Sequence, residues 1–172
     1  MKNVEKFFGP SVVELEIQIP AEGKNNFIYC SLRNNKRKKA PDYEIDDDNF
    51  NIKNFGEATN KLVPGEKYLV SFFPKIDKTV SPKNCLIFLS IKNSLLPGAE
   101  GLLRVLQLGK EKMPKGMYLN FLVKKENMWK DSQSLRRFPR LYIHLDGEAK
   151  ISLGYYDCEL TQLNLLVSIV KI

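Results

Sequence analysis

The sequence contains few of the residues that most often carry out chemistry. Its 172 residues include one histidine, one tryptophan and three cysteines. The cysteines are Cys30, Cys85 and Cys158, and none belongs to a C-x-x-C pair, which argues against a disulfide framework and a thiolate metal site. Each lies in an apolar context typical of a strand. We therefore expect all three thiols to be buried as small hydrophobic groups.

Long hydrophobic runs are also missing. No apolar stretch approaches the ~20 residues that a membrane-spanning helix needs. Residues 1–10 lack the long apolar segment behind basic residues that marks a secretory signal. We therefore expect no membrane insertion and a cytoplasmic location, in the host cytoplasm if the chain is a phage or effector product.

Nucleotide and metal motifs are absent. Neither G-x-x-x-x-G-K-[ST] nor G-x-G-x-x-G occurs. The acidic run that starts at Asp46 fails the calcium-loop pattern in two registers, because Asn51 or Ile52 stands where that loop requires glycine. The sequence therefore predicts no metal and no cofactor.

The single histidine, His144, shares one face of an expected strand with Tyr142 and Asp146. Such a set could support proton transfer. Side chains two positions apart on a strand lie ~7 Å from one another, so direct hydrogen bonds between them do not follow. We favour a structural or solvent-facing role for His144 and predict no catalytic residue.

What is present suits one folded domain over residues 1–172. The apolar fraction is 43% and the net charge is +7. This apolar fraction is enough for a sizeable core in a chain of ordinary domain length. A basic surface favours acidic partners such as nucleic acid, anionic lipid or an acidic protein face.

Only one stretch shows a clear helical pattern, residues 97–112. Pro97 lies near its first turn, where a missing N–H costs little, and lysines occupy the last turn. Arg104 and Gln107 are expected to point away from the apolar face. The residues expected on that apolar face are Ala99, Leu102, Leu103, Val105 and Leu106.

The remaining pattern is that of short strands. Alternating or continuous apolar runs predict strands at 11–20, 27–32, 67–76, 85–91, 117–123, 141–145, 149–156 and 162–172, and residues 54–62 are a short helix or a loop. We expect a mainly β, β-rich α+β fold, with about eight strands in an antiparallel sandwich or small barrel. The helix at 97–112 should cover its core.

A charged loop interrupts this pattern at residues 34–51. Counted from Arg33, five positive charges are followed by five negative ones, so the segment neutralises itself. We predict an exposed, mobile loop that proteases cut early.

The most suggestive stretch for binding is residues 124–142. Cations that contact phosphates beside rings that stack on bases are how single-stranded nucleic acid is bound. A basic loop around one buried tryptophan would show the same composition. The candidate binding residues here are Lys124, Lys125, Trp129, Lys130, Arg136, Arg137, Phe138, Arg140 and Tyr142, with Lys36, Arg37, Lys38 and Lys39 as a second contact.

Three functions follow from these patterns. The first is a non-enzymatic binding or assembly module that makes protein–protein contacts through its loops and a basic surface. The second is a protein that binds single-stranded DNA or RNA through residues 124–142, with Arg136, Arg137 and Arg140 on one open face and an exposed Trp129 or Phe138 ring. The third, an enzyme, would need a deep pocket with convergent polar groups.

Overall fold

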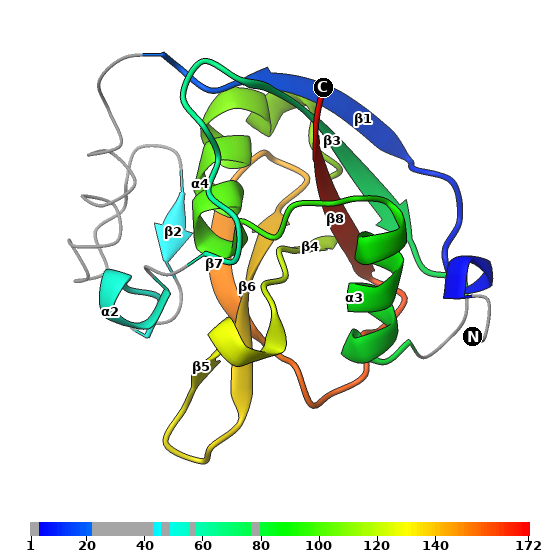
Figure 1. Ribbon diagram of the computed structural model, residues 1–172, viewed down its shortest axis with the longest axis vertical. Helices are drawn as coiled ribbons and strands as arrows, with labels where there is room; N and C mark the ends of the chain where they lie inside the picture. Colours follow the sequence, from blue (N-terminus) through cyan, green and yellow to red (C-terminus); the bar gives the residue numbers. More distant parts are fainter. Residues whose placement is uncertain (1–3, 22–42, 46–48, 56–57, 77–79) are drawn as a thin grey trace.

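The computed structural model describes residues 4–21, 43–45, 49–55, 58–76 and 80–172. Figure 1 shows the arrangement, with η1 beside α3 and the C-terminus beside β1 and β3. The helices are η1 (Val4–Phe7), α2 (Ile52–Phe55), α3 (Pro82–Ile91), α4 (Gly98–Gly109), η2 (Lys110–Lys112) and η3 (Lys125–Asn127). The strands are β1 (Val13–Gln18), β2 (Glu44–Ile45), β3 (Lys67–Pro74), β4 (Tyr118–Asn120), β5 (Trp129–Lys130), β6 (Arg136–Ile143), β7 (Ala149–Tyr155) and β8 (Asn164–Lys171).

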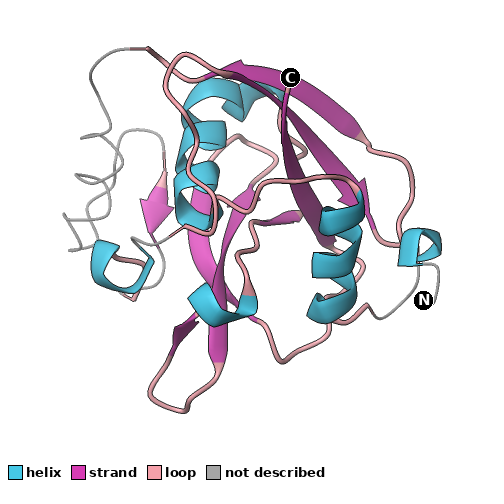
Figure 2. Cartoon of the chain, in the orientation of Figure 1, coloured by secondary structure: helices cyan, strands magenta, loops and turns pink. Residues whose placement is uncertain are grey.

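Within the described ranges, all eight strands belong to one sheet (Figure 2). Their order is β1-β3-β8-β4-β6-β7-β2, and β5 pairs with β6 beside this path. The pairs β4–β8 and β2–β7 are parallel and the others are antiparallel, so the sheet is mixed. The predicted β-rich α+β class is confirmed. The sheet does not close into a barrel, because β1 and β2 end it without pairing to one another.

The sheet separates two hydrophobic cores. Side chains alternate along each strand, so one strand supplies both cores. In β8, Leu165 and Val167 belong to the first core, which contains α4, whereas Leu166 belongs to the second core, which contains α3 and η1. The helices α4 and α3 therefore cover opposite faces of the sheet.

The helix expected at 97–112 is confirmed as α4 followed by the short turn η2. Leu102, Leu103 and Leu106 are buried in the first core. Arg104 is also buried, so the expectation that it points away is wrong. Its Nη1 donates to Gln107 Oε1 at 3.3 Å, which shows how a long stem can be covered while the charged head reaches polar partners.

The prediction of a strand at 85–91 is wrong, because these residues form the helix α3. Cys85, Phe88 and Leu89 are buried at helical spacing, and Ile87 and Ile91 face outward. A continuous apolar run of this length fits either a buried strand or a helix. The residues just before it decide, since Ser81 Oγ accepts from the Asn84 N–H at 3.3 Å and Pro82 occupies the first turn.

Strand ends differ from the sequence pattern in two places. The strand expected at 117–123 is only three residues long, as β4. The strand expected at 141–145 starts much earlier, as β6, within the segment expected to be a basic loop. The strand expected at 27–32 lies outside the described residues.

Part of the segment 34–51 is packed against the body. Tyr43 and Phe50 are buried in the first core, and β2 pairs with β7. The count of charges along this segment did not reveal these apolar contacts. The charged residues 34–42 and 46–48 lie outside the described residues. For these residues alone, the exposed loop stays a prediction.

None of the helices in the described ranges combines the length and the apolar character needed to cross a membrane.

Candidate binding face

The candidate site lies on the sheet face opposite α4, over β4, β6 and β7. Along β6 the side chains on this face change from the buried Phe138 to Arg140 and Tyr142, which are only partly buried. We call this region the polar face. Its members, which alternate with residues of the first core, are Tyr118, Asn120, Arg140, Tyr142 and Ser152.

Arg140 occupies the centre of the polar face. The strand register places it opposite Asn120 on β4 and opposite Ser152 on β7. Its Nε–H donates to Ser152 Oγ at 2.8 Å, and its guanidinium carbon lies 4.4 Å from the centroid of the Tyr118 ring. No carboxylate of the described residues forms an ion pair with it. The two Nη groups are therefore left for another molecule or for water.

A chain of amide hydrogen bonds runs beside Arg140. Asn164 Nδ2 donates to Thr161 Oγ1 at 2.8 Å, which turns Asn164 Oδ1 toward Asn120. Asn120 Nδ2 donates to that oxygen at 3.1 Å and to the Leu165 carbonyl at 2.9 Å. These contacts set which way both amides point.

This orientation leaves Asn120 Oδ1 buried with no hydrogen-bond partner among the described residues. Asn120 is 0% exposed. A buried acceptor without a partner costs about 1–3 kcal/mol. Arg140 thus offers a donor group on the polar face, while the unsatisfied acceptor of the directly opposed Asn120 is covered by its neighbours.

An open pocket of about 280 Å³ joins these groups. Phe138, 0% exposed, lies at its base, and Gly154 allows this ring to cross β7, since a Cβ there would lie 2.5 Å from Phe138 Cζ. The segment after β7 supplies much of the remaining wall. The residues that line the pocket are Tyr118, Asn120, Phe138, Arg140, Gly154, Tyr155, Cys158, Glu159, Leu160, Thr161 and Asn164.

Aromatic rings continue the polar face beyond the pocket. The Tyr118 and Tyr142 ring centroids are 4.9 Å apart, and the Tyr142 and His144 centroids are 4.7 Å apart with their planes at 81°. Asp146 Oδ1 accepts from the backbone N–H of Glu148 at 2.9 Å. Asp146 is thus engaged in its own turn, and it forms no hydrogen bond that would orient His144 as a base.

The arginines predicted to act together are divided by β6. Strand alternation places Arg136 and Arg140 on one face and Arg137 on the other. Arg137 Nε lies 3.0 Å from Asp131 Oδ2, and its guanidinium lies 3.5 Å from the Tyr155 ring centroid. The expectation that all three share one open face is therefore not met, because these residues form a strand rather than a loop.

The two rings expected to be exposed pack against the hydrophobic cores instead. Phe138 is completely buried in the second core. Trp129 pairs with Arg137 across the β5–β6 ladder and packs against the first core, 5.9 Å from Phe55 between ring centroids. The rings available on the polar face are instead Tyr118 and Tyr142, and only Tyr142 was singled out from the sequence.

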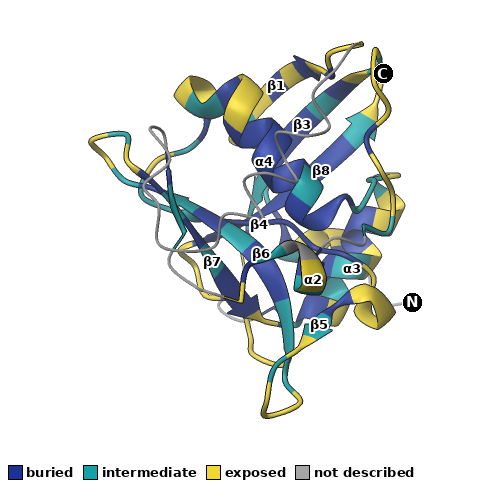
Figure 3. Ribbon diagram, turned by 90° about the vertical axis from the view of Figure 1, so that its left-hand side faces the viewer, coloured by how far each residue is buried: buried dark blue, intermediate teal, exposed yellow. Residues whose placement is uncertain are grey.

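The other predicted cations gather near the β5–β6 hairpin, which projects from the body (Figure 1) with an exposed tip (Figure 3). Lys124, Lys125 and Lys130 are exposed, and Arg136 is partly buried beside Lys130 on the neighbouring strand. Among the described residues none of these four has an ion-pair partner. We call them the hairpin cations. Lys36, Arg37, Lys38 and Lys39 lie outside the described residues.

Several site residues escaped the sequence analysis, among them Tyr118, Asn120, Thr161 and Asn164. They come from β4, β8 and the turn before β8, which meet only in the folded sheet. Asn120 did carry a signal, since it is a polar residue inside the apolar run 117–123. Buried polar side chains of this kind need partners, and partners point to a site.

The cysteines differ from expectation in one case. Cys85 is buried, and this burial raises the pKa of its thiol to about 12 although Lys75 lowers it. Cys158 is exposed at the pocket, so its expected burial is wrong. It lies in the turn after β7, whereas its neighbours Tyr156 and Leu160 are buried in the second core. Both thiols are free, and Cys30 lies outside the described residues.

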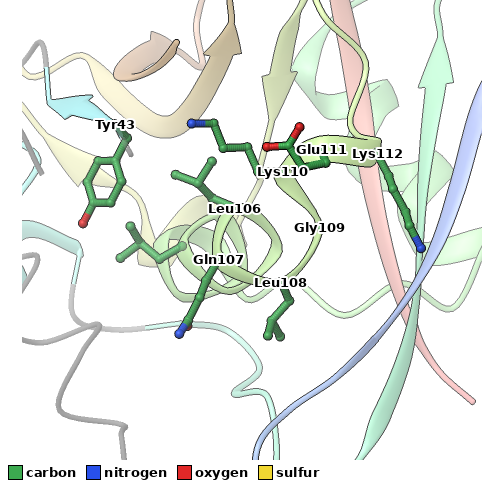
Figure 4. A pocket seen from close by; sticks show the side chains of 9 residues that line it. Tyr43, Leu106, Gln107, Leu108, Gly109, Lys110, Glu111 and Lys112 are labelled. Carbon is green, nitrogen blue, oxygen red and sulfur yellow. The ribbon is translucent and has the colours of Figure 1, made fainter. Parts of the chain in front are cut away.

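A second pocket, of about 340 Å³, lies at the end of α4 (Figure 4). Leu103 and Leu106 give it an apolar floor, and the Tyr43 ring faces them from the other side. Lys110 and Glu111 contribute charge at its rim, whereas Lys112 extends away from Tyr43. This pocket shares none of its residues with the polar face.

Metal ligands do not cluster in the part of the chain that the structure describes, where no group of three or more His, Cys, Asp or Glu side chains could hold an ion.

No protein-family model matches the chain, and no curated protein or solved structure matches it either.

Proposed function

We propose that this protein is a non-enzymatic binding module that contacts an acidic segment of a partner protein with its polar face and the neighbouring hairpin cations. Arg140 carries this proposal. Ser152 and the Tyr118 ring hold its guanidinium, while its Nη groups meet no carboxylate of the described residues. A cation fixed in this way on a strand loses little conformational entropy when it binds.

Charge and chemistry support the same proposal. The net charge of +7 and the hairpin cations favour an acidic partner and speed its approach. Two of the groups that could act as a base or a nucleophile are engaged elsewhere or shielded. Asp146 bonds its own turn, and the raised pKa of Cys85 keeps that thiol protonated.

Capture from the lysate of the native cell tests the proposal when matched variants are compared. Arg140→Gln removes the charge on the polar face but keeps most of the side chain. Lys67→Gln removes one positive charge from an exposed position on β3, outside the pocket and away from the hairpin cations.

Partners retained by the wild type and by Lys67→Gln but lost from Arg140→Gln would support the proposal. Equal retention by all three proteins, each with an unchanged melting temperature, would overturn it.

Single-stranded DNA or RNA is a second candidate ligand. The specific observation is the series of rings Tyr118, Tyr142 and His144 on the sheet face, next to cations that no described carboxylate neutralises. Sheet-face rings of this kind stack on unpaired bases.

A heparin column with a salt gradient, followed by titration of a fluorescein-labelled single strand, tests this candidate. Tyr142→Ala should then weaken binding by about 1–3 kcal/mol, and each cation lost should flatten the salt dependence by about 0.7. No binding at low salt would exclude it.

A further inference from the structure

We infer that the pocket on the polar face receives the C-terminal carboxylate of a peptide from the partner protein. This inference rests on the proposed function and names the chemical group that the site recognises. It is built from the two opposed side chains Arg140 and Asn120, which offer complementary halves of one hydrogen-bonding site.

The donor half of the site suits a carboxylate. The two Nη groups of Arg140 can approach both oxygens of a carboxylate in a parallel, bidentate fashion. Thr161 Oγ1 lines the same pocket and accepts from Asn164 Nδ2, so its own hydroxyl proton is available to donate. Both donors are fixed by contacts within the fold before any ligand arrives.

The acceptor half suits the N–H of the last residue of a peptide. Asn120 Oδ1 is buried and lacks a donor among the described residues. Residues directly opposed on antiparallel strands have Cβ atoms about 4.5–5.5 Å apart. In a C-terminal residue, a single Cα separates the carboxylate from the backbone N–H, so one residue is long enough to span Arg140 and Asn120. Because Asn120 is 0% exposed, the N–H reaches its Oδ1 only when the side chains over it move aside on binding.

The walls of the pocket favour a peptide over a nucleic acid. Glu159 lines the pocket and can accept from a peptide N–H, and its carboxylate repels the row of phosphates along a nucleic acid more than a single terminal carboxylate bound to Arg140. The Tyr155 ring, 41% exposed, provides apolar surface for the last side chain. Only one arginine and no lysine line the pocket, whereas a phosphate backbone needs a row of cations.

The size of the pocket favours a chain end over a continuous chain. Its volume of about 280 Å³ lies near the lower limit of small-ligand sites. Tyr155 and the segment from Cys158 to Thr161 wall one side, and the strands β4 and β6 supply the other lining residues. A terminal residue can bind in this pocket because no further part of the peptide has to continue past that wall.

The test uses two fluorescein-labelled pools of six-residue peptides, randomised at the last three positions. One pool ends in free carboxylates and the other in carboxamides. Fluorescence anisotropy with the full chain should show binding of the free-acid pool, weakened about 10-fold or more by amidation, because hydrogen bonds to charged groups are among the stronger ones. Arg140→Gln should lose this preference, and Lys67→Gln, which changes an exposed residue of β3 outside the pocket, should keep it.

Cys158 provides an independent readout, because it is exposed and lines the pocket. In a Cys30→Ser background, the free-acid pool should slow alkylation of Cys158 by iodoacetamide, and the amidated pool should not. Cys85 interferes little, because it is buried and protonated.

The outcomes separate this inference from the proposed function. If acidic peptides with free and amidated ends bind equally and both need Arg140, the C-terminal inference fails and the binding module stands. If a labelled single strand protects Cys158 and the peptides do not, nucleic acid is the ligand. If no probe binds or protects Cys158, and no native partner depends on Arg140, both proposals fail.

Discussion

Burial decides what individual side chains of this protein can do. Arg137 and Arg140 lie three positions apart on β6, yet one neutralises Asp131 and the other faces the pocket. The thiols of Cys85 and Cys158 differ in the same way, one protonated in a core and one exposed. Residue type therefore says less about function here than the face of the strand or helix on which the residue stands.

Glu100 gives a prediction about pH. Burial raises the pKa of its carboxyl above the ordinary value of 4.5, although Arg104, the Leu62 backbone and Lys61 lower it. Folding thus favours the protonated carboxyl of Glu100. The protonated carboxyl makes its full contribution to the free energy of unfolding below the unfolded pKa, and this contribution is lost as the pH rises through the folded pKa. Glu100→Gln should therefore raise the melting temperature at neutral pH and leave it unchanged near about pH 3.

Exposed Glu111→Gln is the matched control for Glu100→Gln and should shift neither melting temperature. A Glu100→Gln protein that melts lower than the wild type at neutral pH would contradict the expected direction of the shift. Thermal melting followed by circular dichroism across this pH range makes the comparison.

Gly154 gives a prediction about packing at the base of the pocket. Gly154→Ala would place a methyl group 2.5 Å from Phe138 Cζ, and the buried ring has little room to retreat. We expect a loss of about 1–3 kcal/mol in the free energy of unfolding, measured by urea denaturation. Phe138→Leu in the same chain should relieve part of this clash, so the two losses should not add.

Additive losses from Gly154→Ala and Phe138→Leu would show that the ring does not cross β7 at this glycine.

At the scale of single elements, local signals settle the helices. In α4 the apolar period and the flanking Pro and Gly agree. In α3 the hydrophobic residues alone were ambiguous, and the Ser81–Pro82 start decided the structure. The strands depend more on their neighbours, as β6 shows by extending through a basic segment beside β7 and β5.

Leu106 tests the packing of α4. Leu106→Ala should lower the free energy of unfolding by about 2–5 kcal/mol, because Leu106 is 4% exposed and its truncation leaves a cavity in the first core. Leu108→Ala, on the same helix but 38% exposed, should cost much less. Equal effects of the two variants in urea denaturation would show that α4 does not pack into the first core through Leu106.

Ser81 tests the start of α3. Ser81→Ala removes the side-chain oxygen that accepts from the Asn84 N–H, and it should cost about 0.5–2 kcal/mol. Ser81→Asp should retain most of the stability, since aspartate also caps helices. Exposed Ser90→Ala on the same helix serves as the control. A negligible loss from Ser81→Ala alone in urea denaturation would show that this cap does not stabilise α3.

At the scale of the whole molecule, one sheet is shared by two cores. Strands such as β3 and β8 send alternate side chains into each core, so neither core can lose its packing without disturbing the other. This sharing supports the expectation of one domain over residues 1–172, which stays a prediction. It also links the site to both cores, because Phe138 belongs to the second core and Leu141 to the first.

Alkylation of Cys85 tests this coupling. Cys85 lies in the second core, and Leu106 lies in the first. If the chain unfolds as one unit, Leu106→Ala should speed alkylation of Cys85 at least about 30-fold, because reaction requires opening and a loss of about 2 kcal/mol raises the open population by that factor. The experiment needs a Cys30→Ser, Cys158→Ser background. An unchanged rate, with Leu106→Ala still destabilising, would indicate two independently unfolding units.

Local patterns determined much of this protein before folding was considered. The helical period between Pro97 and Gly116 predicted α4, and alternating or continuous apolar runs predicted β1, β3 and β8. Asp146-Gly147 predicted the turn between β6 and β7, where Gly147 adopts a φ of 93°. These features depend on a few adjacent residues, so they can be inferred from the chain alone.

Tertiary structure alone decided the binding face. Asn120, Arg140, Thr161 and Asn164 come from separate segments, and the pairing of β4 with both β6 and β8 brings them together. Strand alternation alone separated Arg137 from Arg140, once the basic segment proved to be part of a strand. The physical reason is that alternation along one strand predicts which of its side chains lie on the same side of the sheet. The order of the strands determines which side chains of other strands share that side.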